Sequence, residues 1–231
     1  MTMERPARIL IQCRLGSSRL PGKALLPVGG VPAAVLCAQR AGNLGRQVLV
    51  AIPEGVDDEI LASMLSRHGI PFMRGALEDV LGRFVDATAD LPDHACVVRL
   101  TADNLFPDGE FIERLLEAFE RSGATYFGTW SPVDGLPYGV SGEVFSVSIL
   151  RKAATQAADR FDREHVTPWI IRECEPETPD LRTWCDGDLS HLRCTIDNLD
   201  DYRCVEQLFS GVADPVRTGW RELCGLLLRC T

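Results

Sequence analysis

Short apolar runs alternate with amphipathic stretches over the first 125 residues of the chain. Apolar runs bounded by turn residues predict strands at 8–13, 47–52, 70–74 and 95–100. Helical periodicity predicts helices at 32–42, 56–69, 77–91 and 108–123. In the second of these helices, the residues expected to face inward are Ile60, Leu61, Met64 and Leu65. Such alternation predicts an α/β fold with a mainly parallel, mixed sheet and helices on both faces.

The second half of the chain is less regular. Residues 129–142 are rich in Gly and Pro and carry Trp130, Leu136 and Tyr138, which predicts an exposed arm that contacts a second subunit. The remaining pattern predicts strands at 143–149, 180–185 and 192–197, and helices at 149–159, 163–174, 199–211 and 220–230. No linker is long enough to divide the chain, so residues 1–231 are predicted to form a single domain.

The turn after the first strand has the composition of a phosphate-binding loop. Ligands of parallel sheets bind beyond the carboxyl ends of the strands, where the loops 14–23, 74–79 and 101–107 are expected to meet. The first loop combines Gly16, Ser17 and Ser18 with three cations, which are Arg14, Arg19 and Lys23. Exposed backbone N–H groups and nearby cations favour a phosphate chain. The alternative is an ordinary strand-to-helix connection with solvated cations.

Neither common phosphate-loop pattern is present in this turn. Five residues separate Gly16 from Gly22 and Ala24 follows Lys23, so the Walker spacing and its hydroxyl are missing. The dinucleotide pattern G-x-G-x-x-G is also absent. The loop is therefore predicted to hold phosphates in another way.

Composition excludes several classes of protein. The formal net charge of −9 disfavours binding to nucleic acid or to an anionic membrane. The sequence has no 18-residue apolar run and no apolar secretory segment near its start, and its nine cysteines form no C-x-x-C pair. These features predict a cytoplasmic protein with reduced, mostly buried cysteines.

The stretch "IQCRLGSSRLPGKALLPVGG" closely resembles the N-terminal signature of the spore-coat-polysaccharide and acylneuraminate cytidylyltransferase-like family, sugar nucleotidyltransferases that use CTP. Further blocks resemble the family in the same order, between roughly residues 8 and 210: "FMRGALEDVLGRF", "VVRLTADNLFPDGEFI", "GEVFSVSIL", "FDREHVTPWI" and "LRCTIDNLDDYRCVEQLF". The resemblance implies a Rossmann-like nucleotidyltransferase fold, Mg²⁺ as cofactor and a homodimer. It divides the domain into a nucleotide-binding half, 8–127, and an acceptor-binding and dimerisation half, 128–231.

The resemblance also implies roles for individual residues of the first half and for Asp197. Lys23 becomes the catalytic lysine, helped by Arg14 and Arg19, and Asp103 and Asp197 become the magnesium ligands. The implied nucleotide-binding residues are Gln12, Arg14, Gly16, Ser17, Ser18, Lys23, Arg74, Gly75 and Asp79.

Each polar residue also has a simpler interpretation. Gln12 can be a strand-end amide and Asp103 a turn residue. Asp197 or Asn198 can cap a helix, and Asp79 can face the N-terminus of one.

The implied acceptor-binding residues come mainly from the second half. They are Asn104, Glu143, Arg163, Glu164 and His165. The alternative for "FDREH" is a solvated turn that follows a helix cap at Asp162. Two departures bear on the acceptor: Ala102, Asn104 and Leu105 replace family residues around Asp103, and residues 140–142 differ before Glu143.

Together these features predict transfer of CMP from CTP to an acidic sugar or another anionic acceptor, with release of pyrophosphate. Two alternatives are a glycosyltransferase on a similar fold and a non-catalytic nucleotide-sensing protein. A glycosyltransferase typically carries D-x-D, whereas "TADN" supplies one acid. The joint presence of Lys23, Asp103 and Asp197 argues against a sensor without chemistry.

Overall fold

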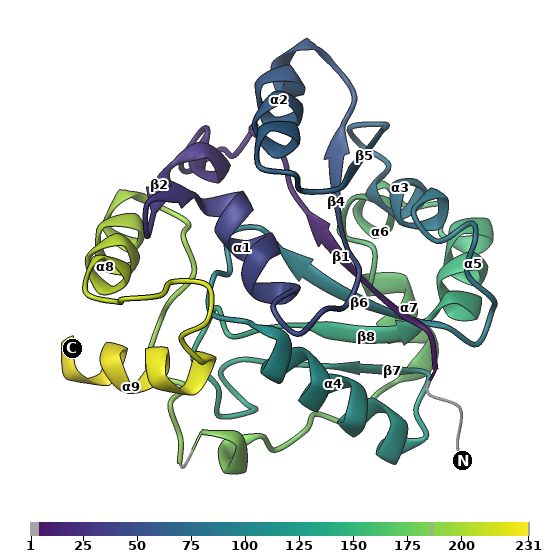
Figure 1. Cartoon of the computed structure of the whole chain (residues 1–231). Coiled ribbons are helices and arrows are strands. Elements are labelled where there is room, and N and C mark those ends of the chain that lie inside the picture. The colour runs from purple at the N-terminus through teal and green to yellow at the C-terminus, as the bar shows by residue number, and fades with distance from the viewer. Residues whose placement is uncertain (1–4, 186, 231) are drawn as a thin grey trace.

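A six-stranded mixed sheet forms the centre of the computed structural model, which describes residues 5–185 and 187–230 (Figure 1). The strand order is β5 (Phe72–Gly75), β4 (Val48–Pro53), β1 (Ala7–Gln12), β6 (Cys96–Thr101), β8 (Glu143–Ser146) and β7 (Tyr126–Gly128). The first four are parallel, whereas β8 runs antiparallel to β6 and to β7. The predicted fold class is confirmed.

Helices cover both faces of the sheet because successive strand residues point to opposite sides. Ile9 and Ile11 of β1 belong to one core with α1 (Ala33–Ala41), α2 (Glu59–Arg67) and α4 (Gly109–Ser122). Leu10 belongs to a second core with side chains of α3 (Val80–Asp86), α5 (Val147–Gln156) and α7 (Pro168–Cys174) (Figure 1). The short helix α6 (Arg160–His165) precedes α7, and Val166, directly after α6, belongs to the same core.

The first core extends to the C-terminal helices. Side chains of α8 (Leu199–Ser210) and α9 (Trp220–Cys230) belong to it, and Trp220 is fully buried. A small antiparallel pair, β2 (Pro27–Val28) and β3 (Val31–Pro32), contacts α1 and α8. None of the helices in the described part of the chain is long and apolar enough to span a membrane.

Several predicted elements differ from the structure. The predicted helix 163–174 is divided into α6 and α7, because Pro168 has no N–H to donate and its ring disfavours a continuous helix. The strand predicted at 180–185 is a 3-10 turn at Arg182–Trp184, and 192–197 forms only isolated bridges to Asn104 and Tyr138. Ile60 was expected inside but is 59% exposed, because the buried face of α2 is formed by Leu61, Ala62 and Leu65.

The segment 129–142 packs on its own subunit. Leu136 and Val140 are buried, and the buried Asp134 carboxylate accepts the backbone N–H groups of Trp130 and Leu136. Tyr138 stays partly exposed and stacks its ring under the Arg193 guanidinium. The expectation of an exposed arm is therefore wrong for Leu136. The homodimer stays a prediction that depends on the family resemblance.

The sheet brings distant loops to one edge, as predicted. Gln12 pairs with Ala51 on β4 and with Thr101 on β6, so the carboxyl ends of these strands coincide. The antiparallel β8 adds a contact that a parallel sheet would not make. Its first residue, Glu143, lies opposite Arg99 of β6.

Candidate active site

A cavity of about 290 Å³ opens at the carboxyl edge of β1 and β6. It is lined by side chains from the first loop, from the turn after β6, from the end of α6 and from the segment before α8. The predicted site residues among them are Gln12, Arg14, Ser17, Ser18, Arg19, Lys23, Asp103, His165 and Asp197. The structure therefore joins both halves of the chain around one cavity.

Lys23 forms the centre of the polar contacts in this cavity. Its ammonium donates to Asp103 Oδ2 at 2.5 Å, to the Ile196 carbonyl at 2.7 Å and to Asp197 Oδ1 at 3.3 Å. Its side chain is only 15% exposed. Lys23 follows Gly22, whose φ of 73° is in the left-handed region that favours glycine. The turn at Gly22 thus starts the 3-10 turn that carries the lysine.

Asp197 is almost completely buried and receives three cations. Besides Lys23, Arg19 donates to its Oδ1 and Arg193 to its Oδ2, both at 2.7 Å. Arg193 donates hydrogen bonds to Asp201 and to Asp197. These bonds, and most of all the one to Asp201, raise the pKa of the Arg193 guanidinium. The cap of α8 is the neighbouring Asn198, which accepts the N–H groups of Asp200 and Asp201. Asp197 is therefore free of the capping role that the sequence left open.

The loop that carries Asp103 is held from behind by a buried arginine that sequence reasoning missed. Arg40 donates to the carbonyls of Leu105 and Phe106, and also to those of Pro215 and Thr218 near α9. Burial lowers its pKa to about 10, although Asp108 acts in the opposite direction. The only signal in the sequence was a cation inside an apolar helix face.

The end of α6 has a strained backbone next to the cavity. Val166 has φ 70° and ψ −56°, and the Thr167 N–H donates to the His165 carbonyl at 2.8 Å across it. This is a γ-turn of the rare, strained kind, here with a buried β-branched residue at its centre. His165 lines the cavity and its ring lies 4.4 Å from that of Phe161. Strain of this kind occurs at functional sites where the surroundings maintain it.

Glu164 contacts the first loop without belonging to the cavity lining. Its carboxylate pairs with Arg14 at 3.2 Å, and its carbonyl accepts a long hydrogen bond of 3.5 Å from Gln12. Gly16 lies in the same loop, also outside the lining. Glu164 therefore connects α6 to the cations of the first loop.

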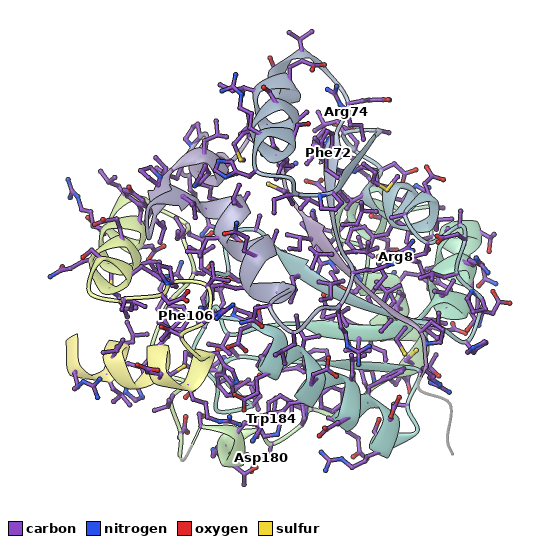
Figure 2. All side chains as sticks on the ribbon, viewed as in Figure 1. Arg8, Phe72, Arg74, Phe106, Asp180 and Trp184 are labelled. Atoms are coloured by element: carbon purple, nitrogen blue, oxygen red, sulfur yellow. The ribbon has the colours of Figure 1, made fainter. Side chains whose placement is uncertain are left out.

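Four other predicted residues lie away from the lining of this cavity. Arg74 pairs with Glu59 of α2 at 2.7 Å, at the outer end of β5 (Figure 2). Gly75 lies against Arg83, because an added Cβ would be 2.6 Å from its Cγ. Asp79 was assigned to the nucleotide and Arg163 to the acceptor, but the Arg163 guanidinium donates a 2.6 Å hydrogen bond to the Asp79 carboxylate.

The Asp79–Arg163 pair holds α3 and α6 together. Asp79 also caps α3 by accepting the Gly82 N–H at 2.9 Å, and Arg163 donates to the carbonyls of Ala154 and Ala157. Partial burial alone would raise the pKa of Asp79, but the hydrogen bonds from Arg163 and Gly82 outweigh burial and lower it. The interpretation of Asp79 as an acid at a helix N-terminus is thus confirmed. The contacts of Arg163 are with Asp79 and with two backbone carbonyls, so they hold α6 in place.

A second cavity, of about 200 Å³, shares Thr101 with the first. Glu143 lines it, and Asn104 donates to two of its hydroxyls, those of Thr101 and Ser141. Arg99, which sequence reasoning missed, also lines it and pairs with Glu143. Its signal was a cation within the apolar run "ACVVRL".

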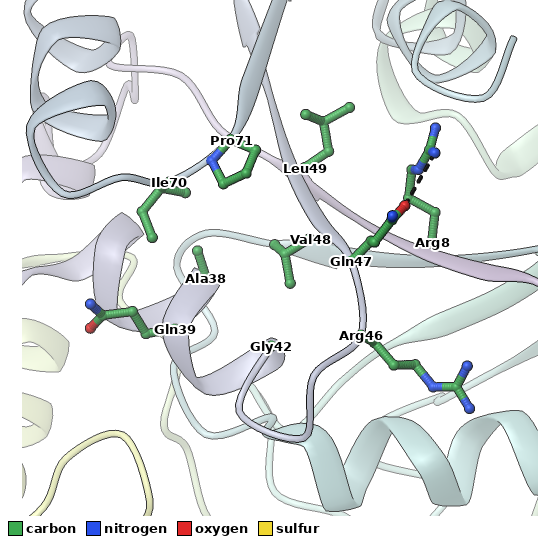
Figure 3. A pocket seen from close by; sticks show the side chains of 10 residues that line it. All are labelled: Arg8, Ala38, Gln39, Gly42, Arg46, Gln47, Val48, Leu49, Ile70 and Pro71. Carbon is green, nitrogen blue, oxygen red and sulfur yellow. Dashed lines mark hydrogen bonds between the residues drawn. The ribbon is translucent and has the colours of Figure 1, made fainter. Parts of the chain in front are cut away.

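A larger hollow, of about 660 Å³, lies at the opposite, amino edge of the sheet (Figure 3). Its two cations already have acidic partners: Arg8 pairs with Asp90, and Arg46 with Glu113. Val48, Leu49 and Ile70 supply much of the remaining lining. The described residues of its lining include no carboxylate, whereas three cations and two carboxylates converge at the carboxyl edge, so the smaller cavity is the candidate active site.

Comparison with known proteins identifies the family of the chain. Residues 8–196, which include Lys23 and Asp103, match the family model described as cytidylyltransferase. The chain belongs to the cytidylyltransferase family. It is 28% identical over 233 residues to the spore coat polysaccharide biosynthesis protein SpsF of Bacillus subtilis (strain 168), covering 95% of this chain and 93% of that protein.

Two further similarities extend the comparison. It is 30% identical over 178 residues to the 3-deoxy-manno-octulosonate cytidylyltransferase of Xanthomonas axonopodis pv. citri (strain 306), covering 73% of this chain and 65% of that protein. A solved cytidylyltransferase from Leptospira borgpetersenii has a TM-score of 0.85 at 24% identity, covering 98% of this chain and 95% of that one. That likeness supports the fold.

Proposed function

We propose that this member of the cytidylyltransferase family transfers CMP from CTP to an acidic sugar and releases pyrophosphate. The single observation that carries the proposal is the convergence of Lys23, Asp103 and Asp197 in the cavity at the carboxyl edge. An acceptor hydroxyl oxygen attacks the α-phosphorus, and the bond from that phosphorus to the bridging oxygen breaks. The pyrophosphate takes the bonding electrons, and the hydroxyl proton passes to solvent.

The cations of the first loop would then stabilise the triphosphate. Each of these cations already pairs with a carboxylate. Lys23 pairs with Asp103 and Asp197, Arg14 pairs with Glu164, and Arg19 pairs with Asp197. Arg14 and Arg19 are well exposed, at 43% and 65%, so both guanidinium groups would be free to turn toward the phosphate oxygens. Lys23 is held more deeply, where a fixed positive charge best stabilises negative charge that develops on the leaving pyrophosphate.

The donor set fits a magnesium ion that is bound together with the nucleotide. Asp103 and Asp197 share the Lys23 ammonium, which places their oxygens around one point. Within the described residues, no group of three or more His, Cys, Asp or Glu side chains could hold a metal by itself. Two carboxylates with phosphate oxygens and waters suit the octahedral preference of Mg²⁺. When bound, the ion would neutralise phosphate charge, while Lys23 moves from the carboxylates toward the phosphates.

The names of two relatives support an acidic sugar as the acceptor. One relative is a 3-deoxy-manno-octulosonate cytidylyltransferase, and another is a spore coat polysaccharide biosynthesis protein. We therefore expect a sugar acid whose CMP conjugate enters a surface polysaccharide or a related conjugate. The family resemblance is the reason to expect a homodimer as the working form.

A screen for pyrophosphate release tests the proposal. Purified protein with Mg²⁺ is incubated with CTP, ATP, GTP or UTP and with sugar acids such as 3-deoxy-manno-octulosonate, each beside its methyl ester and a neutral sugar. We expect release with CTP and an acid. CTP should also stabilise the protein against thermal unfolding more than the other triphosphates do, because bound ligand adds RT ln(1 + [L]/Kd) to stability.

Two outcomes would support the alternatives instead. Nucleotide-specific stabilisation without pyrophosphate release by any acceptor would indicate a nucleotide sensor. Stronger stabilisation by a nucleoside diphosphate sugar than by CTP would indicate a glycosyltransferase. Equal stabilisation by all four triphosphates would show that the cavity binds phosphate and does not distinguish the base.

A further inference from the structure

The second cavity has a composition that suits a small polar ligand. Besides Arg99 and Glu143, its lining includes the hydroxyl side chains of Thr101, Thr129 and Ser141. It adjoins the candidate active site in two ways. Thr101 lines both cavities, and Arg99 donates at 3.0 Å to Gln12, which lines the larger one. A ligand here would therefore lie beside the nucleotide site.

The carboxylate of Glu143 is already satisfied by the protein. Its Oε2 accepts from Arg99, and its Oε1 accepts from the Tyr126 hydroxyl at 2.7 Å. Burial, reinforced by the charge of Glu143, raises the pKa of Tyr126, so the phenol keeps the proton that it donates. Glu143 thus holds Arg99 in place and has little capacity left for a ligand.

Arg99 has an unused donor, in contrast to Glu143. Its two terminal nitrogens bind Glu143 and Gln12, but its Nε is a buried atom without a partner among the residues described. A buried donor without a partner is costly, so such an atom calls for a ligand or a water. The unused donor of the only cation in this lining favours an acceptor-rich, negatively charged group.

The hydroxyls around Arg99 have donors to offer as well. Thr101 and Ser141 accept from the Asn104 amide at 3.1 and 2.7 Å, and Thr129 accepts from the Gly142 N–H at 3.2 Å. Each hydroxyl that accepts keeps one O–H for donation. None of these three O–H groups has an acceptor among residues 5–185 and 187–230. The pocket therefore combines one cation with several donors.

We propose that this 200 Å³ pocket is the acceptor subsite and that Arg99 selects the carboxylate of the acidic sugar. The proposal rests on the function proposed above and assigns the specificity to β6 and β8. It replaces Arg163 as the acceptor-binding arginine, because Arg163 already binds Asp79 and two backbone carbonyls. Carboxylate recognition by guanidinium uses directed N–H groups that lysine cannot reproduce.

The test compares Arg99→Lys with a surface control, Arg151→Lys, whose arginine pairs with Asp93 far from both cavities. With the acids of the screen, Arg99→Lys should raise the acceptor KM about tenfold and leave the KM for CTP within about twofold. Methyl esters should bind wild type as poorly as the acids bind Arg99→Lys, and the substitution should not weaken them further. Arg151→Lys should behave as wild type.

A second variant and a second readout separate this proposal from the proposed function. Thr129→Val removes one hydroxyl and keeps nearly the same side-chain shape, so it should raise the KM for the acid about threefold. This variant keeps the proposal testable even if Arg99→Lys folds poorly. Thermal stabilisation by 3-deoxy-manno-octulosonate, compared with its methyl ester, reports binding without turnover.

The outcomes are distinguishable. Stabilisation by the acid that depends on Arg99, without pyrophosphate release, would keep the subsite and reject the function. Pyrophosphate release with equal KM for acid and ester, or an Arg99→Lys defect confined to CTP, would overturn the subsite. The absence of any preference for acid over ester in both readouts would overturn it as well.

Discussion

The Lys23 ammonium donates a 2.5 Å hydrogen bond to Asp103, 80 residues further along the chain. The parallel pairing of β1 with β6 creates this contact, because it aligns Gln12 with Thr101 and so aligns the turns that follow them. Lys23 also reaches Asp197, from the segment before α8. One cation therefore balances two acids that would otherwise repel each other in a partly buried site.

Replacing Lys23 should impair turnover far more than folding. Lys23→Ala is expected to lower kcat by about 10²–10³, the usual effect of removing one charge that stabilises a transition state. Steady-state pyrophosphate release measures this, and Lys152→Ala, which breaks the exposed pair with Glu173, is the control that should keep full activity. Ordinary turnover by Lys23→Ala would remove the basis of the proposed mechanism.

The two acids should differ from a neighbouring acid in their effect on magnesium dependence. Asp103→Asn and Asp197→Asn each remove a charged ligand, so the Mg²⁺ concentration for half-maximal activity should rise about tenfold or more. Asp200→Asn is the control, since Asp200 is an exposed acid of α8 that pairs with Arg203 and is absent from the cavity lining. It should keep the Mg²⁺ dependence of wild type. An equal shift in all three variants would contradict the metal assignment.

The sequence could predict what depends on local pattern and on parallel strands. The alternation of strands and helices placed Lys23 and Asp103 at one edge, and the structure confirms that placement. Family resemblance added Asp197, whose capping alternative was equally reasonable until Asn198 proved to be the cap. The placement of Lys23 beside Asp103 needed only the direction of the strands.

Contacts set by tertiary packing could not be predicted in the same way. Arg99 faces Glu143 only because β8 enters the sheet antiparallel, a register that periodicity does not encode. Arg163 was predicted to bind the acceptor, yet the packing of α6 on α3 brings it to Asp79. A sequence shows which side chains are charged, but not which groups they contact in the fold.

The Asp79–Arg163 pair should make stability sensitive to acid. The folded pKa of Asp79 is lowered, so the unfolded chain binds more protons in that range and stability falls as the pH falls. The contribution is complete above the unfolded pKa of about 3.9 and is lost as the pH drops through the lower folded value. Asp79→Asn should therefore be less stable than wild type at neutral pH, with a difference that shrinks below about pH 4.

Thermal unfolding across that pH range measures the difference. Glu78→Gln, which breaks an exposed pair with Arg160, is the control and should stay within about 0.5 kcal/mol of wild type at neutral pH. A difference between Asp79→Asn and wild type that stays constant with pH would show that the carboxylate charge does not stabilise the fold.

The strained turn after α6 can be tested by comparing two substitutions at Val166. Both Val166→Gly and Val166→Ala remove buried methyl groups, so both should destabilise the protein. Glycine tolerates the φ of 70°, whereas alanine keeps the clash of Cβ with the backbone. The glycine variant should therefore be the more stable of the two by about 1 kcal/mol, measured by urea unfolding.

The usual order in a helix makes the result informative. At Ala118, inside α4, replacement by glycine should cost about 1 kcal/mol. At Val166 the glycine variant should instead be more stable than the alanine variant. That reversal would come from backbone strain that the packing of α6 and α7 maintains beside His165. If Val166→Ala proves more stable than Val166→Gly, the turn stores no strain. His165 would then owe its place in the cavity to side-chain packing alone, including its contact with Phe161.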